Sequence, residues 1–214
     1  MNQKDRFFRW RERTAPKTRY LVDAVLQRIA PEFEKHGFVW YPDFAGDDAR
    51  EIGANEIPLQ QRLGSEWPTV QIYFYKGNWG PRFRIAFAAL PEMCRSLIQP
   101  QVPRDRAVAQ YGAAYFYLSR GKWRDYRDTE FGFNWMPMLL PRPSDVMRLV
   151  AYSSNWKRYL DAEVAAALAL LPGLFELFDK GIPTEWVMRA RGPVSEHVRL
   201  VHSWKIWDSY RART

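Results

Sequence analysis

The chain has 214 residues, a formal net charge of +8 and a hydrophobic content of 47%, which is the composition of a globular protein with a sizeable core. Its longest apolar run, Val164 to Leu171, is much shorter than the roughly 18 residues of a membrane span. The N-terminal residues lack the apolar stretch of a secretory signal, and the one cysteine, Cys94, excludes an intrachain disulfide. We therefore expect a cytoplasmic protein that does not enter a membrane.

Aromatic residues make up 16% of the chain and include ten tryptophans. This exceeds what a core normally needs, and it indicates aromatic-lined surfaces or an oligomer interface. The alternative is a thick core that holds most of these rings, because large aromatic side chains are usually buried.

The positive charge is concentrated near the N-terminus. Residues 1–20 carry seven basic and two acidic side chains, a net +5, whereas residues 21–60 carry three basic and eight acidic side chains, a net −5. We interpret residues 1–13 as a basic N-terminal arm, either solvated or docked on a partner. Its arginines, interleaved with Phe7, Phe8 and Trp10, also suit contact with phosphate backbones.

A first long helix is predicted after Pro16, because apolar side chains recur three or four residues apart until Gly37, which is typical of a helix C-cap. Pro31 removes a backbone hydrogen bond and predicts a break between residues 27 and 30. Residues 38–41 then fit a short strand. The apolar stripe of the helix consists of Val22, Val25, Leu26, Ile29 and Phe33.

Residues 42–56 are acidic and contain two glycines, which predicts a loop. Their carboxylates do not have the spacing of an EF-hand loop, so no metal site is expected. Residues 57–64 alternate as a strand does, and Pro58 places the start of that strand at an edge.

Residues 67–90 have the cleanest period-two alternation in the chain and predict a central antiparallel hairpin. Its register should keep the large apolar side chains on one face, because a slip by one residue would turn them all into water. The predicted pairs are Phe74 with Phe83, Ile72 with Ile85 and Val70 with Phe87.

The opposite face of this hairpin carries Tyr73, Tyr75, Arg82 and Arg84. Paired aromatic rings and guanidinium groups on a rigid sheet are suited to stack on bases or to anchor a protein partner. This Tyr/Arg face is therefore our candidate binding site. The structural alternative is that helices cover it, with the arginine stems packed over the tyrosine rings.

Beyond the hairpin the pattern is weaker. Residues 91–98 fit a short helix, and residues 111–118 and 131–135 fit strands, but glycines, prolines and charges interrupt every period between residues 111 and 143. Farther on, Ser144 and Asp145 are predicted to cap one helix.

Asp161 is predicted to cap a second helix, rich in Ala and Leu, that Pro172 and Gly173 interrupt. Residues 198–207 fit a strand or a helix, and the sequence leaves both open. The elements together predict one α+β domain over residues 14–214, in which an antiparallel sheet packs against an N-terminal helix and C-terminal helices.

Sequence signatures of the common nucleotide sites and of the serine-hydrolase elbow are absent. A hydrolase would take its general base from His197 or His202, yet their five-residue spacing puts them on different faces of a helix or a strand. Cys94 has no local histidine to activate it and is expected to be a buried thiol. We expect no catalytic residue, no cofactor and no metal.

The helix that ends in Lys35-His36-Gly37-Phe38, the acidic loop and the strands at residues 57–63, 67–76 and 82–90 resemble uncharacterised bacterial domain-of-unknown-function families. Those families are similar in style to small cytoplasmic proteins of toxin-immunity and defence clusters. The resemblance implies no functional residues.

We therefore expect a bacterial cytoplasmic protein, without catalytic activity, that acts by contact with a protein partner or with a second copy of itself. One alternative is a nucleic-acid-binding protein that uses the basic arm and the Tyr/Arg face. The other is a hydrolase that uses His197 or His202.

Overall fold

The computed structural model describes residues 3–40, 53–61, 69–75, 79–88, 115–118, 129–135, 143–180 and 198–201. The helix expected at residues 91–98, most of the acidic loop, Cys94, His197 and His202 lie outside these residues.

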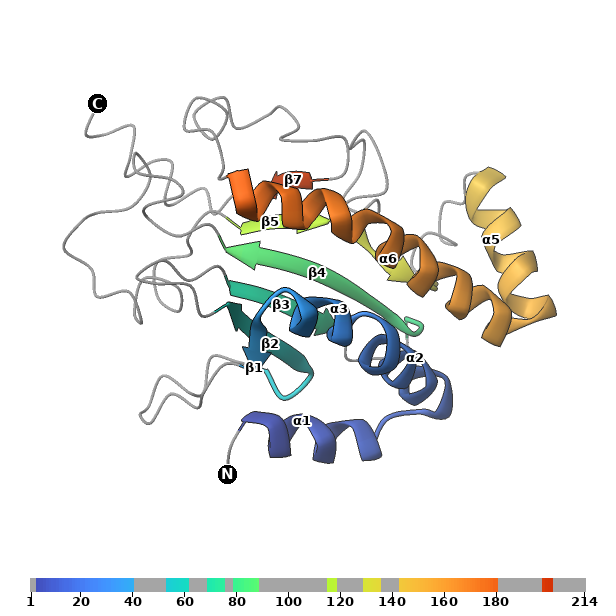
Figure 1. Cartoon of the computed structure of the whole chain (residues 1–214). Helices are drawn as coiled ribbons and strands as arrows, with labels where there is room; N and C mark the ends of the chain where they lie inside the picture. The colour runs from blue at the N-terminus through green and yellow to red at the C-terminus, as the bar shows by residue number, and fades with distance from the viewer. Residues whose placement is uncertain are drawn as a thin grey trace, which may run out of the picture.

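The described elements form an α+β architecture, as the sequence predicts (Figure 1). The helices are α1 (Gln3–Glu12), α2 (Pro16–Arg28), α3 (Ala30–Lys35), α5 (Pro143–Ser154) and α6 (Trp156–Lys180). The strands are β1 (Phe38–Trp40), β2 (Glu56–Gln61), β3 (Thr69–Phe74), β4 (Arg82–Ala88), β5 (Tyr115–Leu118), β6 (Phe131–Gly132) and β7 (Val198–Val201).

In the described part of the chain, the strands form one antiparallel sheet in the order β1-β2-β3-β4-β5-β7. The short strand β6 pairs with Arg82 and Phe83 at the beginning of β4, whereas β5 pairs with residues 86–88 at its end. Because β7 pairs with β5, the ambiguous C-terminal run is a strand over residues 198–201.

The hairpin of β3 and β4 has the predicted register. Ile72 pairs with Ile85, and Tyr73 pairs with Arg84. The apolar residues of this hairpin are fully buried on one face of the sheet, which confirms that the alternation marks an inside and an outside. Those fully buried are Val70, Ile72, Phe74, Phe83 and Ile85.

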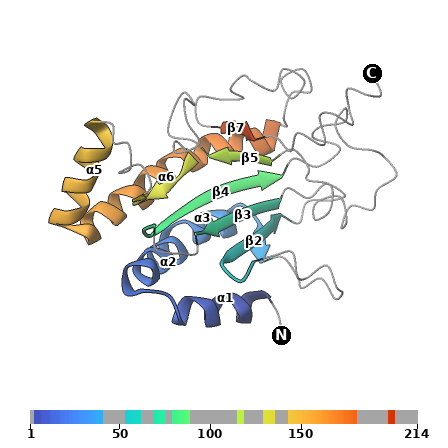
Figure 2. The ribbon, with the colours of Figure 1, turned by 180° about the vertical axis from the view of Figure 1, so that it is seen from behind.

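Helices α2, α3 and α6 cover this apolar face, and Figure 2 shows the strands from the other side, in front of these helices. The helices contribute one buried stripe each, as expected for amphipathic helices packed on a sheet. Helix residues in the core include Leu21, Val22, Val25, Ile29, Phe33, Leu160, Val164, Ala167, Leu171 and Leu174.

The break expected near Pro31 is present. Helix α2 ends at Arg28, α3 begins at Ala30, and Ile29 between them stays fully buried. Gly37 follows His36, the C-cap of α3, and has a φ of 79°, which is the left-handed conformation that makes glycine common at helix ends.

The interpretation of residues 1–13 as a solvated arm is wrong for the described residues, because residues 3–12 form helix α1. Phe7 is fully buried, and its ring lies 5.9 Å from the ring of Phe74 and 5.6 Å from that of Trp40. Arg11 also donates a hydrogen bond of 2.5 Å to Asp23 of α2. The aromatic residues interleaved with the arginines therefore form the inner face of an amphipathic helix.

The two C-terminal helices begin earlier than predicted. Helix α5 starts at Pro143, so Ser144 and Asp145 lie in its first turn. Helix α6 starts at Trp156 and is capped by Asn155, whose Oδ1 accepts a hydrogen bond of 3.1 Å from the backbone of Arg158. Asp161 is thus inside the helix.

Pro172 does not interrupt α6, which runs on to Lys180. A proline inside a helix removes one hydrogen bond and costs stability. Here Leu171 and Leu174 on either side of it are buried, so packing on the sheet holds the helix together across the proline. None of the described helices has both the length and the apolar character needed to cross a membrane.

Candidate functional site

The sheet brings the four residues of the Tyr/Arg face together. The rings of Tyr73 and Tyr75 meet edge to face with their centroids 4.9 Å apart. The guanidinium carbon of Arg82 lies 4.1 Å from the centre of the Tyr75 ring, and that of Arg84 lies 5.1 Å from it. Both arginines therefore make cation–π contacts with one tyrosine.

The Tyr/Arg face also contains a carboxylate that no sequence pattern marks. Glu130 Oε2 lies 3.3 Å from Arg82 Nε, and Glu130 Oε1 accepts a hydrogen bond of 3.1 Å from Arg84 Nη2. Asn134 donates a further hydrogen bond of 2.9 Å to Glu130 Oε2. Glu130 therefore neutralises one of the two positive charges.

Little of this ionic cluster reaches the solvent. The side chains of Arg82, Arg84 and Glu130 are 7%, 16% and 4% exposed. Phosphate contacts require cationic groups that an incoming anion can reach. The arginine stems do pack on tyrosine, as the structural alternative held, but Glu130 on the segment leading into β6 binds them, and no described helix does so.

Strand β6 is held in place from the opposite direction by the two C-terminal helices. The Gly132 N–H donates a hydrogen bond of 2.7 Å to Glu163 of α6, and the Gly132 carbonyl accepts one of 3.0 Å from Arg148 of α5. Gly132 has a φ of 110°, and a Cβ at this position would lie 2.3 Å from the carbonyl oxygen of Pro81. Glycine is required here because a side chain has no room.

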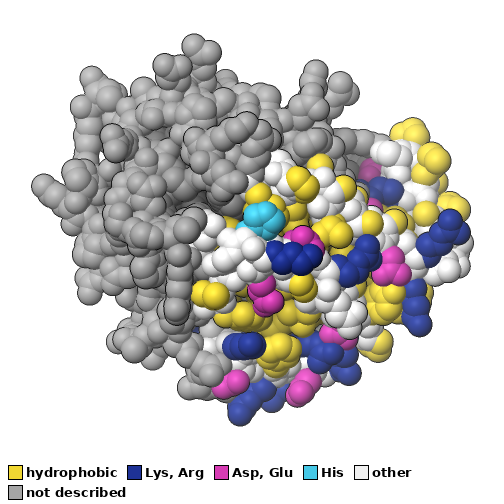
Figure 3. Space-filling view, viewed as in Figure 1, with side chains coloured by type: hydrophobic (Ala, Val, Ile, Leu, Met, Phe, Trp, Pro, Cys, Tyr) yellow, Lys and Arg dark blue, Asp and Glu magenta, His cyan; other side chains and the backbone are white. Residues whose placement is uncertain are grey.

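A second surface is formed by α5. Its residues Val146, Met147 and Val150 are 46%, 74% and 63% exposed, and their spacing puts them on one side of the helix. Leu149 and Tyr152 lie on the opposite side and pack on the core. We call the three exposed residues the α5 apolar face; Figure 3 shows apolar side chains at the end of the molecule where α5 lies.

Trp79 and Trp135 are two further large hydrophobic residues at the surface, 46% and 42% exposed. They are joined through the backbone, because the Trp135 N–H donates a hydrogen bond of 2.7 Å to the Trp79 carbonyl. The Trp135 ring contacts Phe133, whose own ring stacks on Tyr152 of α5 at 4.0 Å. These contacts link the tryptophan pair to the inner side of α5.

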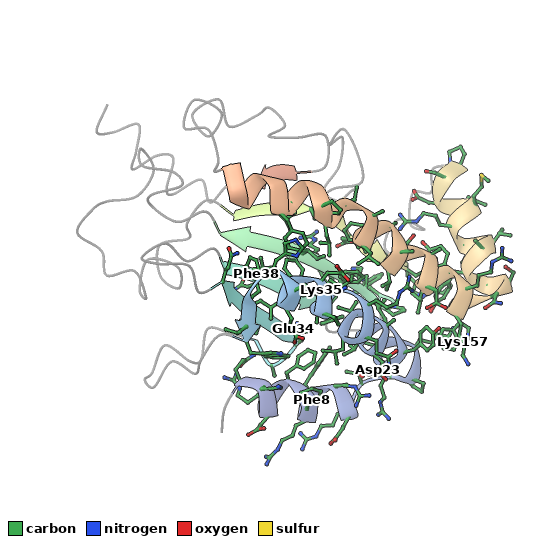
Figure 4. The ribbon with its side chains drawn as sticks, viewed as in Figure 1. Phe8, Asp23, Glu34, Lys35, Phe38 and Lys157 are labelled. Atoms are coloured by element: carbon green, nitrogen blue, oxygen red, sulfur yellow. The ribbon has the colours of Figure 1, made fainter. Side chains whose placement is uncertain are left out.

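Three basic residues lie where α5 meets α2 and α6, and we call Lys17, Lys157 and Arg158 the basic corner. All three are exposed. The Lys17 ammonium lies 4.8 Å from the centre of the Tyr152 ring. Lys157, labelled in Figure 4, lies 5.6 Å from the ring of Trp156.

The corner is anchored by a tyrosine of α2. The Tyr20 hydroxyl donates a hydrogen bond of 2.8 Å to Asp161 of α6, and the Tyr20 ring meets Trp156 edge to face at 5.2 Å. Burial, together with this hydrogen bond, raises the pKa of Tyr20 above its ordinary value. The rings beneath the two lysines are therefore fixed by contacts between helices.

The exposed surface of α1 carries charges of both signs. Lys4 and Arg9 are exposed, as are Asp5, Glu12 and Arg13, which directly follows the helix. Since the acidic residues lie among the basic ones, this helix does not present the continuous positive stripe that is typical of a nucleic-acid interface.

No model of a protein family matches the chain, and neither a curated protein nor a solved structure matches it. Among the residues that the structure describes, no group of three or more His, Cys, Asp or Glu side chains is placed to hold a metal ion. His197 and His202 lie outside those residues, so the hydrolase alternative stays a prediction from the sequence.

Proposed function

We propose that the protein acts by protein–protein contact and that the α5 apolar face is its binding surface. The observation that carries this proposal is the exposure of Val146, Met147 and Val150 together on one helix face. Clustered apolar side chains at a surface are typical of protein interaction sites, and methionine is common at such sites because its flexible side chain adapts to a partner.

The Tyr/Arg face is a weaker candidate for the binding surface than the α5 apolar face. Its guanidinium groups are largely buried and bound to Glu130, so a partner would have to displace a carboxylate to reach them. The α5 apolar face needs no such rearrangement. Its side chains already lie at the surface, and covering them removes apolar area from water.

A photo-cross-linking residue in place of Met147 tests this function in cells that make the protein naturally. We expect one discrete adduct with another protein, and we expect Val150→Asp in the same chain to abolish it. The matched control places the cross-linker at Arg9, which is exposed on α1, where the adduct should not form.

An adduct that forms equally from both positions, or that survives Val150→Asp, would contradict a specific interface on α5. Failure to form any adduct from position 147 would contradict it as well. The unfolding midpoints of the variants should match that of the wild type, since these side chains are exposed.

On the sequence resemblance alone, we also propose that the partner belongs to a bacterial toxin-immunity or defence system. The genes beside the coding sequence test this setting. A toxin or defence gene in the same operon would support it, and an operon of unrelated metabolic genes would argue against it.

A further inference from the structure

We infer that the partner is an acidic protein, whose apolar side chains cover the α5 apolar face and whose carboxylates meet the basic corner. This inference rests on the proposed function and names the chemistry of the partner. The observation behind it is the distribution of charge from α5 into the first turn of α6, which follows the end of α5 after one residue.

The charged side chains between residues 143 and 160 differ in how far they are buried. Asp145 is only 6% exposed, and Arg148 is half-buried with hydrogen bonds to the Tyr159 hydroxyl and the Gly132 carbonyl. Lys157 and Arg158 are exposed. The exposed charges in this range are therefore positive, and Lys17 of α2 adds another at the same corner. Asp161, the next charged residue of α6, has a side chain that is 45% exposed, but its carboxylate lies 3.7 Å from Arg28 and accepts the hydrogen bond from Tyr20.

The lysines of the corner are held in position before a partner arrives. Lys17 lies 4.8 Å from the Tyr152 ring and 5.7 Å from the Trp156 ring, and Lys157 lies 5.6 Å from Trp156 and 5.9 Å from Tyr20. Cation–π contacts of this kind restrict a long side chain. Ordering a flexible lysine opposes binding, so restricted lysines favour the capture of carboxylates.

The same charges argue against a second copy of the chain. In a two-fold symmetric contact, the same patch lies on both subunits. Two copies of the basic corner would then lie in one interface, between two chains that each carry a net charge of +8. Like charges facing each other oppose association, whereas an acidic partner meets the corner with complementary charge.

Two synthetic peptides probe the inference with the full-length protein. Both form an amphipathic helix with the same leucine stripe, and they differ in having glutamate or lysine beside the stripe. We expect the glutamate peptide to bind at least tenfold more tightly than the lysine peptide at low salt, with a difference that shrinks as salt is added. Met147→Asp should weaken both peptides.

Two double variants decide whether the corner is responsible. Lys157→Glu with Arg158→Glu should abolish or reverse the preference for the glutamate peptide. Lys4→Glu with Arg9→Glu changes the net charge by the same amount on α1 and should leave the preference intact. Circular dichroism and unfolding midpoints check that both variants fold.

An equal effect of the two double variants would overturn the inference, because the preference would then follow net charge. Self-association of the wild type that Met147→Asp abolishes would also overturn it, in favour of a second copy. So would binding of a twenty-nucleotide DNA strand that depends on the basic corner and not on Met147. If Met147→Asp leaves the binding of both peptides unchanged, the proposed function itself fails.

Discussion

Arg82 and Glu130 form a buried ion pair on the outer face of the central hairpin, with Arg82 Nε 3.3 Å from Glu130 Oε2 and side-chain exposures of 7% and 4%. The same carboxylate binds Arg84. One acidic residue, 46 positions along the chain from Arg84, therefore contacts both arginines of the face that the sequence suggests as a binding site.

Glu130→Gln should be strongly destabilising. It keeps the shape of the side chain but removes the negative charge that two largely buried guanidinium groups contact. Removing one partner from a buried ion pair costs about 3 to 5 kcal/mol, and urea unfolding should show a loss of this order.

The exposed pair of Lys35 and Glu32 is the control, with a distance of 2.6 Å and Lys35 67% exposed. Glu32→Gln should cost less than about 1 kcal/mol, because an exposed ion pair contributes little. If Glu130→Gln costs no more than Glu32→Gln, the buried cluster does not hold this face closed.

Phe7→Ala should destabilise the protein by about 3 to 5 kcal/mol, the usual cost of truncating a buried aromatic side chain. Phe7 is fully buried between α1 and the sheet. Arg9→Ala, on the exposed side of the same helix, should change the unfolding free energy by less than about 0.5 kcal/mol. Equal, small effects of the two substitutions would mean that α1 does not dock in solution.

Gly132→Ala and Gly173→Ala should have opposite effects on stability. A Cβ at Gly132 would meet the Pro81 carbonyl oxygen at 2.3 Å, and φ is 110° there, so alanine must displace β6. At Gly173, inside α6, a Cβ meets nothing within 4 Å, and alanine should stabilise the helix by up to about 1 kcal/mol. Thermal melts of the two variants check this, and a tolerated alanine at position 132 would contradict it.

Ionisation of the Tyr152 hydroxyl should make the folded protein less stable as the pH rises into the alkaline range. Burial raises its pKa above the ordinary value, so the folded state keeps the hydroxyl proton at a pH where the unfolded chain loses it. The stability that this provides is complete below about pH 10 and declines as the pH rises from there toward the raised pKa. Tyr152→Phe keeps the stacked ring and should flatten the decline, as measured by denaturant unfolding between pH 8 and 11. An unchanged slope would contradict the assignment to Tyr152.

The hairpin register could be predicted because one residue of slip would turn all the large apolar side chains of the shifted strand toward water, and the period-two alternation records that constraint directly. The break at Ile29 and the helix end before Gly37 followed from the restricted backbone of proline and the freedom of glycine. In each case the local sequence and the packing agree.

Helix α1 could not be assigned from charge alone, because its arginines obscured the aromatic stripe that packs on the sheet. Pro172 predicted an interruption that α6 does not have. The burial of Leu171 and Leu174 outweighs the hydrogen bond that the proline removes. The role of Glu130 could not be predicted, because no local sequence pattern marks it. Its pairing with Arg82 and Arg84 depends on the contact between β6 and β4, which are far apart in the sequence.

The most direct test compares the α5 apolar face with the Tyr/Arg face. It is a calorimetric titration of the full-length protein with the purified partner that cross-links at position 147. We predict that Met147→Asp raises the Kd at least tenfold, while Tyr73→Ala stays within twofold of the wild type. A large loss of affinity with Tyr73→Ala, and none with Met147→Asp, would contradict the assignment of the binding surface to α5.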